Sequence, residues 1–592
     1  MLPAEEYVRR LELRRSAAAA LDKVHIRLGN ARLAIAILGA VVIWASVGRH
    51  LLTPWWIVAP VMAFLAIAIY HYRILRSKDR AQRAIAFYEA GLARIEDRWS
   101  GVGETGVRFA DPHHPYSADL DLFGQGGLFQ LLYTARTRVG EETLARWLLA
   151  PAPVPEIRER QAAAAELRSQ IDLREDLAVL GSRAGVGVYP GELLKWAESP
   201  RELRQRWIPV VAKILVALLI ASLFLYGYRD WATPLILVLL VEGSLAFAIR
   251  NPMESALHST EHAFHNLDLL SGIFARIETH TFHAPRLVAL QQALSTSGVR
   301  ASVAVDRLRT LVDFINSRDN VFVRVIDIPL LYSVQLAFVV ERWRHAHGHA
   351  LASWLDAVGQ MEALLSFAGY SFEHPADTFP EFAEGSPRFD ARQLAHPLLP
   401  AATCVRNQVQ LSESRRTLLV SGSNMSGKST LLRSIGVNTV LAMAGGPVRA
   451  ERLVLTPLHV GASIRINDSL QEGSSRFYAE ITRLRQIFDL AANDPTLLFL
   501  LDELLQGTNS KDRRIGAEGV LRALLGRGAI GLISTHDLAL TEMDASLGAL
   551  VHNVHFQDEF EHGRIMFDYQ LREGVVAKSN GLELMRSIGL DV

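Results

Sequence analysis

The stretch Gly422-Ser-Asn-Met-Ser-Gly-Lys-Ser429 decides the fold of the C-terminal part of the chain. It matches the pattern GxxxxGK[ST], in which glycines allow backbone N–H groups to turn toward phosphate oxygens. A predicted strand, Thr417–Val420, comes directly before the stretch, and a predicted helix begins at Thr430. The pattern requires this context, because the helix N-terminus adds a partial positive charge. The sequence therefore predicts an α/β nucleotide-binding domain around residue 422.

Each polar group in this loop has an expected task. Lys428 should reach the β- and γ-phosphates of a nucleotide, and the Ser429 hydroxyl should ligate Mg²⁺. The implied cofactors are therefore ATP and Mg²⁺. The complete set of phosphate-site residues that we predict is Gly422, Asn424, Met425, Ser426, Gly427, Lys428, Ser429 and Thr430.

Two further predicted strands end in residues suited to hydrolysis. The apolar run Leu497–Leu501 is followed by Asp502 and Glu503. We expect Asp502 to support the Mg²⁺ ion and Glu503 to polarise the attacking water. The run Ile530–Ser534 leads to His536, whose imidazole is expected near the γ-phosphate. Together the three strand ends predict an ATPase in which Glu503 and His536 are catalytic.

Composition limits the rest of the chain. Its 592 residues include 62 Lys and Arg and 62 Asp and Glu, so the formal net charge is zero. This balance argues against a surface built wholly for polyanions, although a local basic face stays possible. Hydrophobic residues make up 49%, which excludes a largely disordered chain, and the single cysteine, Cys404, excludes an intramolecular disulfide. The mean hydropathy of +0.15 is high for so many charges, which indicates concentrated apolar segments.

Four apolar runs account for this hydropathy, and about 20 such residues span a membrane. Lys213 interrupts the third run and Glu242 the fourth, and these two side chains could pair or form an ion relay. Tryptophans near the ends of the runs fit the membrane interface. We predict four transmembrane helices in two hairpins, and the alternative is a pair of hairpins buried in a large soluble core. The runs are Leu33–Val47, Leu51–Tyr70, Trp207–Tyr228 and Trp231–Ile249.

Basic residues give the hairpins a direction. They cluster on the outer flanks of both hairpins, whereas the short connectors hold only Arg49 and Arg229. By the positive-inside rule both hairpins enter from the cytoplasm and return to it. We therefore expect a multi-pass membrane protein with its other domains in the cytoplasm and without a signal peptide.

The regions between these landmarks are mainly helical. Apolar residues recur at three- and four-residue spacing from Asp119 to about Lys195, and residues 252–370 are also helix-rich. The expected organisation is an N-terminal helix (1–32), hairpin 1 (33–70), a connector (71–118), helices (119–206), hairpin 2 (207–249), helices (250–370), a linker (371–388) and the α/β domain (389–592).

From about Phe389 to Leu590 the sequence resembles the MutS-type ATPases, relatives of the ABC class. Residues 119–151 look like the start of that family's helical lever, or core, domain, and residues 252–370 are similar to its returning helices. The resemblance implies an ABC-type P-loop ATPase domain and an all-α lever. The motifs that carry it are His396-Pro397, GSNMSGKSTLLRSIG (422–436), GSSRFYAEI (473–481), LLDELLQGTNSKDR (500–513), STHDLAL (534–540), VHNVHF (551–556) and FDYQLREGVVAKSNGLELM (567–585).

The resemblance further implies a homodimer with composite ATP sites. Ser475 would act on the nucleotide of the partner subunit, and Thr508 and Asn509 would lie in the loop exchanged across the interface. Tyr569 falls where the family places a ring against adenine. Ser426 stands where mismatch-repair members usually have glycine, a difference small enough for phosphate binding to survive.

By this resemblance the chain is expected to bind double-stranded DNA in a process related to mismatch repair. Against this stand the zero net charge and the short segment, residues 1–118, in place of the family's mismatch-reading and connector domains. Phe87 begins a Phe-x-Glu pattern like that of the mismatch reader, but the pattern recurs at Phe379 and Phe382, so a plain helix is favoured there. The alternative function is a membrane-anchored mechanochemical ATPase that acts on a membrane or protein partner. A transporter is a third, weaker candidate, because the LSGGQ-type signature is missing.

Overall fold

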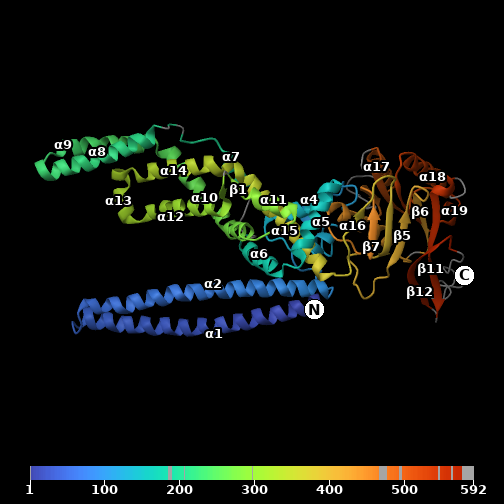
Figure 1. Ribbon diagram of the computed structural model, residues 1–592, viewed down its shortest axis with the longest axis horizontal. Coiled ribbons are helices and arrows are strands. Elements are labelled where there is room, and N and C mark those ends of the chain that lie inside the picture. Colours follow the sequence, from blue (N-terminus) through green and yellow to red (C-terminus); the bar gives the residue numbers. More distant parts are fainter. Residues whose placement is uncertain are drawn as a thin grey trace. The chain divides into compact units, whose positions relative to one another are not determined.

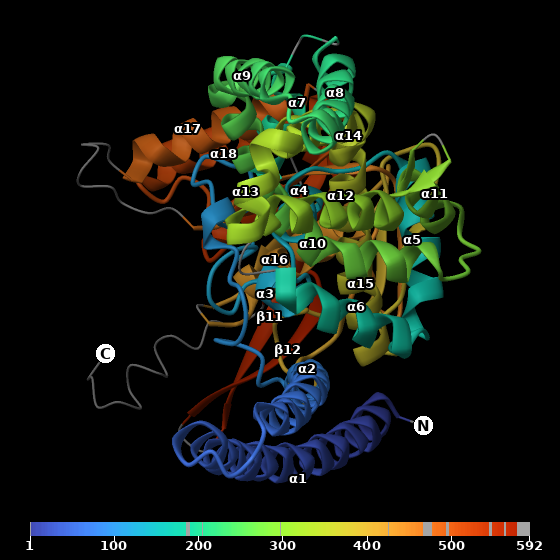
Figure 2. The same ribbon diagram turned by 90° about the vertical axis from the view of Figure 1, so that its left-hand side faces the viewer.

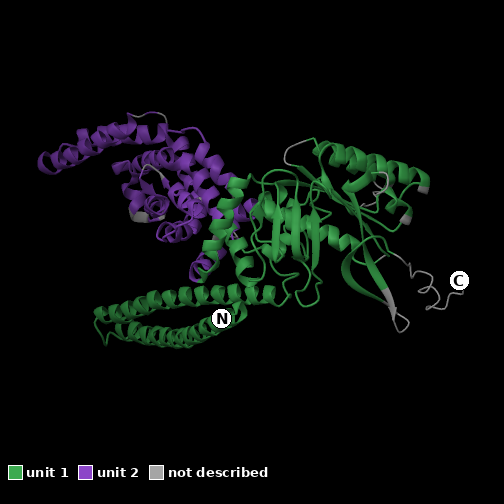
Figure 3. Cartoon of the chain, turned by 45° about the vertical axis from the view of Figure 1, so that its right-hand side comes forward, with its two compact units in different colours: residues 1–134, 145–171, 364–592 green, residues 135–144, 172–363 purple. Residues whose placement is uncertain are grey.

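The computed structural model describes residues 2–184, 190–203, 205, 207–296, 298–423, 425–465, 476–492, 496–543, 547–561 and 564–576. The chain forms two compact units, each assembled from separate stretches of sequence (Figure 3). Unit 1 comprises Met1–Thr134, Ala145–Ile171 and Leu364–Val592, and unit 2 comprises Ala135–Leu144 and Asp172–Ala363.

A six-stranded sheet organises the C-terminal part of unit 1 (Figure 1). Five neighbouring strands are parallel and the edge strand β12 is antiparallel to β11. The central strands are buried on both faces and are therefore almost continuously apolar, as the sequence predicted. The order across the sheet is β12 (Arg564–Glu573), β11 (Val551–Glu561), β6 (Thr417–Ser421), β10 (Ile530–Thr535), β9 (Thr496–Asp502) and β8 (Leu458–Ser463).

Helices cover both faces of this sheet. Helices α17 (Arg476–Leu490) and α18 (Ser510–Gly526) pack on one face, against a buried cluster that includes Phe499 of β9. Helix α16 (Lys428–Ala444) lies on the other face, where Gly436 allows close approach to Leu500. Leu500 is adjacent to Phe499 in the strand, so the two side chains point to opposite faces. The sequence therefore folds into the α/β arrangement that it predicts.

A second, four-stranded sheet joins the ATPase-like part to the preceding helix. Strand β3 falls within the predicted linker 371–388, so that segment is not merely a connection. Helix α15 (Leu351–Glu373) ends inside the same segment. The strand order is β3 (Glu381–Phe382), β7 (Arg452–Leu455), β4 (Phe389–Leu394) and β5 (Asn407–Leu411).

The N-terminal hairpin of unit 1 is a pair of long antiparallel helices, α1 (Pro3–Ile43) and α2 (Val58–Ile95) (Figure 1 and Figure 2). A π-helix, η1 (Trp44–Gly48), and a 3₁₀ turn, η2 (Pro54–Ile57), form its tip. Both helices run through the expected boundaries at residues 32/33 and 70/71, because the charged and the apolar sequences both favour helix. At these positions the amino-acid composition changes, but the helical backbone continues.

The apolar half of this hairpin is exposed. Only 6% of the most apolar part of either helix is buried by the rest of the chain, and Trp55 at the tip is 82% exposed. The alternative of a hairpin buried in a soluble core is therefore wrong for α1 and α2. Phe87, by contrast, is 5% exposed and packs against Tyr7 and Tyr88, as expected of a residue in a packed helix.

Unit 2 holds the second hairpin, α8 (Ile208–Arg229) and α9 (Ala232–Ala248). Of the described residues, three helices are long and apolar enough to cross a membrane by themselves, namely α1 with η1, η2 with α2, and α8. Helix α9 has 17 residues and qualifies only together with α10, across a bend of 61°. A second bent pair, α13 with α14 and α15, brings the upper number to five. Four independent spans, as predicted from sequence, are therefore not found in the described part.

The interrupting charges of this hairpin do not form an ion pair within the described residues. Glu242 is buried, and both of its carboxylate oxygens lack a hydrogen-bond partner there. Lys213 is exposed on α8. One charge is enclosed and the other is open to the surroundings, a difference that spacing along the sequence does not reveal.

The remaining elements are mostly helical, in agreement with the periodicity. In unit 1 they are η3 (Val107–Phe109), α3 (Leu128–Leu132), α5 (Val154–Arg168), α19 (Leu538–Thr541) and η6 (Gly548–Leu550), and α4 (Arg138–Leu149) contributes to both units. In unit 2 they are α6 (Ile171–Ala184), α7 (Pro190–Glu198), α10 (Arg250–Glu278), α11 (Pro285–Ala293), β1 (Ser295–Thr296), β2 (Val299–Arg300), α12 (Ala301–Asn316), η4 (Ser317–Asp319), α13 (Val321–Leu330), α14 (Tyr332–His347) and η5 (Gly348–Ala350).

Candidate active site

The register of the central strands brings the predicted site to one edge of the sheet. Thr535 of β10 lies beside Ser421, the last residue of β6, and Ser534 lies beside Asp502, the last residue of β9. The carboxyl ends of these parallel strands are where open α/β sheets bind ligands. The phosphate loop, the acidic pair and His536 therefore start from adjacent strand ends.

The loop between β6 and α16 needs its glycines for conformation. Gly427 has a φ of +101°, and a Cβ atom there would lie 3.1 Å from the ring of Tyr569. At Gly422 a Cβ atom would lie 2.7 Å from the Ser426 hydroxyl. Ser426 itself is 1% exposed and fits in the loop, so the serine in place of glycine is accommodated. Met425 is 84% exposed at the outside of the loop, and Thr430 is exposed in the first turn of α16.

Lys428 lies inside the loop. Its Nζ donates hydrogen bonds to the carbonyl oxygens of Gly422, at 2.9 Å, and Ser423, at 2.8 Å. Burial lowers the pKa of the Lys428 ammonium, and the nearby carboxylates of Glu503 and Asp502 oppose this shift. The loop thus holds the one long cationic side chain that a P-loop uses to contact phosphates.

Asp502 is held between two hydroxyl groups. Ser429 Oγ donates to Asp502 Oδ2 at 2.5 Å, and Ser534 Oγ donates to Asp502 Oδ1. A serine hydroxyl and a carboxylate side by side are oxygen ligands of the kind that Mg²⁺ prefers. The donor set therefore fits the predicted metal. No group of three or more His, Cys, Asp or Glu side chains suited to a metal ion is found in the described ranges.

Glu503 is fixed by contacts on both sides. Its backbone has a φ of +51°, and its N–H donates to the carbonyl oxygen of Ser534 at 3.2 Å. Its Oε1 lies 3.3 Å from His536 Nδ1, and its Oε2 accepts a hydrogen bond from Gln506 Nε2. The strained backbone at the end of a buried strand aims the carboxylate at the edge where the phosphates are expected.

Three residues that sequence reasoning missed hold this edge together. Gln506 contacts Glu503, and Ser534 contacts Asp502. Glu480 of α17 is buried and accepts the backbone N–H of Leu505, whose φ is +57°. Gln506 follows the acidic pair within the quoted motif, so its position was a usable signal. The roles of Ser534 and Glu480 depend on pairing between distant elements.

Tyr569 reaches the phosphate loop from strand β12. Its ring lies close to Gly427, and its backbone has a φ of +55°. Asn407 of β5 fixes this backbone, since its Nδ2 donates to the Tyr569 carbonyl at 3.0 Å and its Oδ1 accepts the Leu571 N–H at 2.8 Å. Tyr569 as a whole is 43% exposed, so part of its surface is accessible to a ligand.

The remaining predicted residues are either outside the described ranges or away from the strand ends. Asn424 and Ser475 are outside the described residues, as is the rest of 466–475. Asn509 is the N-cap of α18, where its Oδ1 accepts the Asp512 N–H at 2.9 Å, and Thr508 precedes it in the loop. His396 is buried, and burial beside Arg433 and Arg449 lowers its pKa to about 4. His396 is therefore neutral at pH 7 and has a structural place in the His-Pro motif.

A connector segment, residues 111–121, attaches this site to the N-terminal hairpin. Asp119 is 1% exposed, and its Oδ1 accepts the N–H groups of Ile464 and Arg465 at 2.7 and 2.8 Å. Asp121 pairs with Arg465 and also with Arg433 of α16. These contacts fix the chain that leads from β8 into residues 466–475, which contain Ser475.

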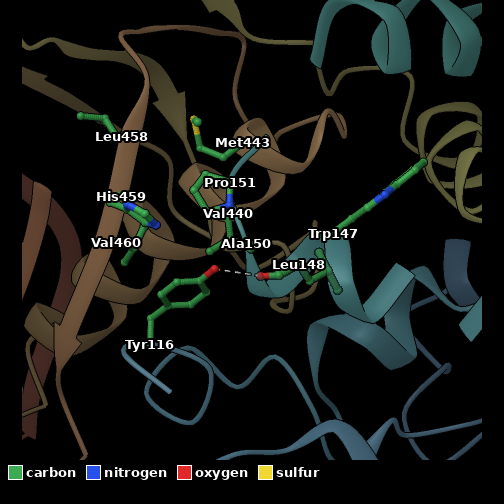
Figure 4. A pocket seen from close by; sticks show the side chains of 10 residues that line it. All are labelled: Tyr116, Trp147, Leu148, Ala150, Pro151, Val440, Met443, Leu458, His459 and Val460. Carbon is green, nitrogen blue, oxygen red and sulfur yellow. Dashed lines mark hydrogen bonds between the residues drawn. The ribbon is translucent and has the colours of Figure 1, made fainter. Parts of the chain in front are cut away.

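A small cavity beside the connector segment shows how tightly it packs. Figure 4 shows Tyr116 pointing toward the end of α4, where its hydroxyl donates to the Leu148 carbonyl at 3.1 Å. The cavity has a volume of about 10 Å³, which is room for about one water molecule. This space is far too small for a nucleotide, so the candidate site is the open edge at the strand ends.

Comparisons with known proteins agree with the geometry. The model of the family described as MutS domain V matches residues 418–591. Endonuclease MutS2 of Thermus thermophilus is 33% identical over 248 residues, which are 42% of this chain and 32% of that protein. The DNA mismatch repair proteins MutS of a Geobacillus species and of Geobacillus kaustophilus are each 32% identical, over 40% of this chain and 27% of their own lengths.

These matches define the extent of the similarity. The C-terminal part of the chain is homologous to MutS and MutS2 proteins, and residues 418–591 match MutS domain V. The chain spans only about a third of the length of these relatives, or less. The predicted resemblance is therefore confirmed for the ATPase part.

Proposed function

We propose that this chain is an Mg²⁺-dependent ATPase that works as a homodimer and is anchored in a membrane by its apolar helices. The observation that carries the ATPase assignment is the arrangement around Asp502 and Glu503. One carboxylate is held by Ser429 and Ser534, and the other is held between His536 and Gln506. Two adjacent carboxylates at the end of β9 are thereby suited to different roles: Asp502 to metal binding and Glu503 to water activation.

The chain's own groups account for the steps of hydrolysis. Lys428 and the loop N–H groups bind the β- and γ-phosphates, and the ring of Tyr569 is open to pack on the base. Ser429 and Asp502 would hold Mg²⁺, which neutralises charge on the phosphates when bound. Glu503 accepts a hydrogen bond from the attacking water and orients it in line with the γ-phosphate. His536, in contact with Glu503, donates a hydrogen bond to the transferring phosphoryl group.

Dimerisation would complete each site. Ser475 would approach the nucleotide of the partner subunit, and Thr508 and Asn509 would lie in the exchanged loop. Support comes from the MutS-type ATPase domain and from the exposed position of Asn509 at the N-terminus of α18. Closed homodimers with two-fold symmetry are the commonest assemblies of soluble domains.

The membrane part of the proposal rests on exposed apolar surface. Single exposed apolar residues are ordinary, but contiguous apolar helices of this length indicate a membrane or a partner. In hairpin α1–α2 the exposed tip carries Trp44, Trp55 and Trp56, and α8 is flanked by Trp207. The cytoplasmic placement of both units follows from the basic flanks. ATP-driven movement of helices attached to the membrane is the function that this architecture supports best.

Duplex DNA is the second candidate for the partner on which the ATPase acts. The observation that favours it is the similarity to DNA mismatch repair proteins MutS, although the similarity covers only the C-terminal part. The zero formal net charge does not add to it. The two candidates differ in what should accelerate ATP turnover.

One experiment tests the proposal. ATP hydrolysis by the full chain is measured in lipid nanodiscs and in detergent, with and without homoduplex and heteroduplex DNA, across a salt series. Lys428→Ala should lower turnover by at least about 100-fold, with Lys195→Ala, an exposed lysine on α7, as a surface control. If the ATPase is coupled to the membrane, the rate of ATP hydrolysis should depend on the bilayer and should not change when DNA is added. DNA stimulation that falls steeply with salt would favour the second candidate instead.

A further inference from the structure

A cavity of about 290 Å³ lies at the foot of the second hairpin, within unit 2. It is lined by Arg201, Leu203, Pro209, Phe338, Glu341 and Arg342. Pro209 belongs to the first turn of α8, and Trp207, directly before that helix, is 57% exposed. Since exposed tryptophans favour the membrane–water interface, the cavity is at the level where α8 would enter the bilayer.

The charges of this cavity are unbalanced. Of the residues that the structure describes, none forms an ion pair or hydrogen bond with the guanidinium of Arg201 or Arg342. Glu341 also lines the cavity and interacts electrostatically with Arg201, but its Oε1 pairs with Arg344 at 2.7 Å. Arg344 in turn donates to Ser199 Oγ and the Pro200 carbonyl, so it is fully engaged. Two guanidinium groups therefore line the cavity without making an ion pair within the described part of the chain.

The second observation is an acceptor that lacks a donor. Glu341 is 6% exposed, and its Oε2 has no hydrogen-bond partner among the described residues. A buried acceptor that stays unpaired is costly, so the site is suited to a ligand that brings a hydrogen-bond donor. The lining is therefore suited to an anionic group that carries a neighbouring hydrogen-bond donor. Leu203 and Phe338 add apolar surface beside it.

We propose that this cavity binds the headgroup of an anionic phospholipid that carries hydroxyl groups, such as phosphatidylglycerol. Arg201 and Arg342 bind the phosphate, a contact for which guanidinium groups are well matched. A headgroup hydroxyl donates to Glu341 Oε2. Basic pockets at the cytoplasmic ends of membrane helices are known to recognise anionic headgroups in this way.

The size and surroundings of the cavity fit a headgroup and not a whole soluble ligand. Its volume is at the lower end of the roughly 300–1,000 Å³ of small-molecule sites. An exposed apolar stripe begins beside Pro209 and continues along α8 at four-residue spacing, through Val210, Ile214 and Leu218. This stripe gives the acyl chains a surface to lie against. The inference rests on the proposed membrane anchoring.

Native mass spectrometry of the detergent-purified full chain tests this site directly. The wild-type chain should retain phosphatidylglycerol severalfold more than phosphatidylcholine. The double variant Arg201→Ala/Arg342→Ala should lower that retention by about tenfold or more, because charge-assisted hydrogen bonds are lost. The control double variant Arg229→Ala/Arg307→Ala removes the same charge outside the cavity and should behave like the wild type.

Two further arms identify the ligand. Phosphatidylmethanol is anionic but has no headgroup donor, so it should be retained less than phosphatidylglycerol; equal retention would overturn the role of Glu341. Inorganic phosphate and glycerol phosphate should not displace the lipid at millimolar concentration. Displacement by either would assign the cavity to a soluble phosphate and overturn the lipid.

Failure of this inference is distinguishable from failure of the proposed function. If the chain inserts into vesicles and hydrolyses ATP but retains both lipids equally, the headgroup site is wrong and the anchored ATPase stands. If the chain does not float with vesicles of either composition, the membrane part of the proposed function is wrong as well.

Discussion

Glu503 and its neighbour Asp502 show how one residue step separates two chemical tasks. Asp502 is the last residue of β9 and accepts from two hydroxyls, which suits a metal-supporting carboxylate. Glu503 turns out of the strand with a φ of +51° and meets His536. This change of backbone direction is why we propose Glu503, and not Asp502, as the residue that activates water.

Replacing Glu503 with Gln should therefore separate binding from hydrolysis. Glutamine keeps the shape and the contact with His536, but it is a poor acceptor for the proton of the attacking water. We expect ATP affinity to stay within a few-fold of wild type and turnover to fall by about 100-fold or more. Equilibrium nucleotide binding and steady-state phosphate release measure the two effects. The matched control is Glu518→Gln, an acid on α18, and full turnover in Glu503→Gln would refute the assignment.

Residues inside one motif were predictable from sequence, whereas residues brought in by other elements were not. Lys428 and Ser429 follow from spacing alone, because the loop and the helix N-terminus are continuous in the chain. Ser534 acts through the pairing of β10 with β9, and Asn407 acts through a side-chain contact from β5 to β12, a strand of the other sheet. A single sequence contains neither relation. The two contacts join residues that are 32 and 162 positions apart in the sequence, which is why these partners were missed.

At the scale of elements, the N-terminus of α4 depends on a buried carboxylate from α15. Glu362 accepts hydrogen bonds from the N–H of Arg136, at 3.1 Å, and from the N–H and hydroxyl of Thr137. Burial raises the pKa of Glu362 from its ordinary value of 4.5 to about 7, although these hydrogen bonds oppose the shift. The acid thus caps the helix start from the side.

This cap makes the stability of unit 2 depend on pH. The folded-state pKa lies above the unfolded one, so the contribution to stability is complete below pH 4.5 and is lost as pH rises through about 7. Between pH 5 and pH 8 the loss should be on the order of 3 kcal/mol. Glu362→Gln mimics the protonated acid and should flatten this part of the profile. Thermal unfolding of both proteins across this range measures it, and equal pH profiles would contradict the cap.

The root of the N-terminal hairpin is a second element-scale junction. Arg94 of α2 makes a bidentate pair with Glu373 at the end of α15, with both distances 2.6 Å, and Tyr7 of α1 donates to the same carboxylate. Arg94 is 8% exposed and Glu373 4%. The three side chains join the two arms of the hairpin to the helix that leads into the ATPase part.

Breaking this pair should loosen the hairpin. Arg94→Met leaves the Glu373 charge buried without its cationic partner, which should cost about 3–5 kcal/mol. The double change Arg94→Met/Glu373→Met removes the unpaired charge and should recover much of the loss. The rate of limited trypsin cleavage within α1, followed by mass spectrometry, reports on the junction. Equal cleavage of wild type and Arg94→Met would show that the hairpin is held by its apolar contacts alone.

The helices themselves were easier to predict than their limits. Periodicity found the helical regions, and hydropathy found both hairpins. Neither could show that α1 and α2 continue beyond the apolar runs or that α9 ends at Ala248, because helix ends depend on local caps and packing. Composition could not predict that the apolar parts of α1 and α2 are exposed, because exposure depends on which other elements pack against them.

At the scale of the whole molecule, unit 1 contains both the hairpin that we propose as a membrane anchor and the domain that we propose as an ATPase. The hairpin root reaches the ATPase part through α15, and the connector segment reaches the chain that leads to residues 466–475 through Asp119. Two separate routes therefore link the N-terminal hairpin to the site. Since 466–475 contains the residue expected to act on the partner's nucleotide, dimerisation and anchoring would influence the same segment.

The composite site makes a quantitative prediction for mixed subunits. Lys428→Ala should inactivate the site on its own subunit, and Ser475→Arg should inactivate the site of its partner, so each homodimer is inactive. In a mixed dimer one site carries both changes, whereas the other combines an intact loop with an intact Ser475. With random exchange about half of the dimers are mixed, and each has one working site of two, so about a quarter of the wild-type ATPase rate should return. Steady-state hydrolysis after subunit exchange measures this fraction, and no recovery in a sample shown to contain mixed dimers would mean that each subunit hydrolyses ATP within itself.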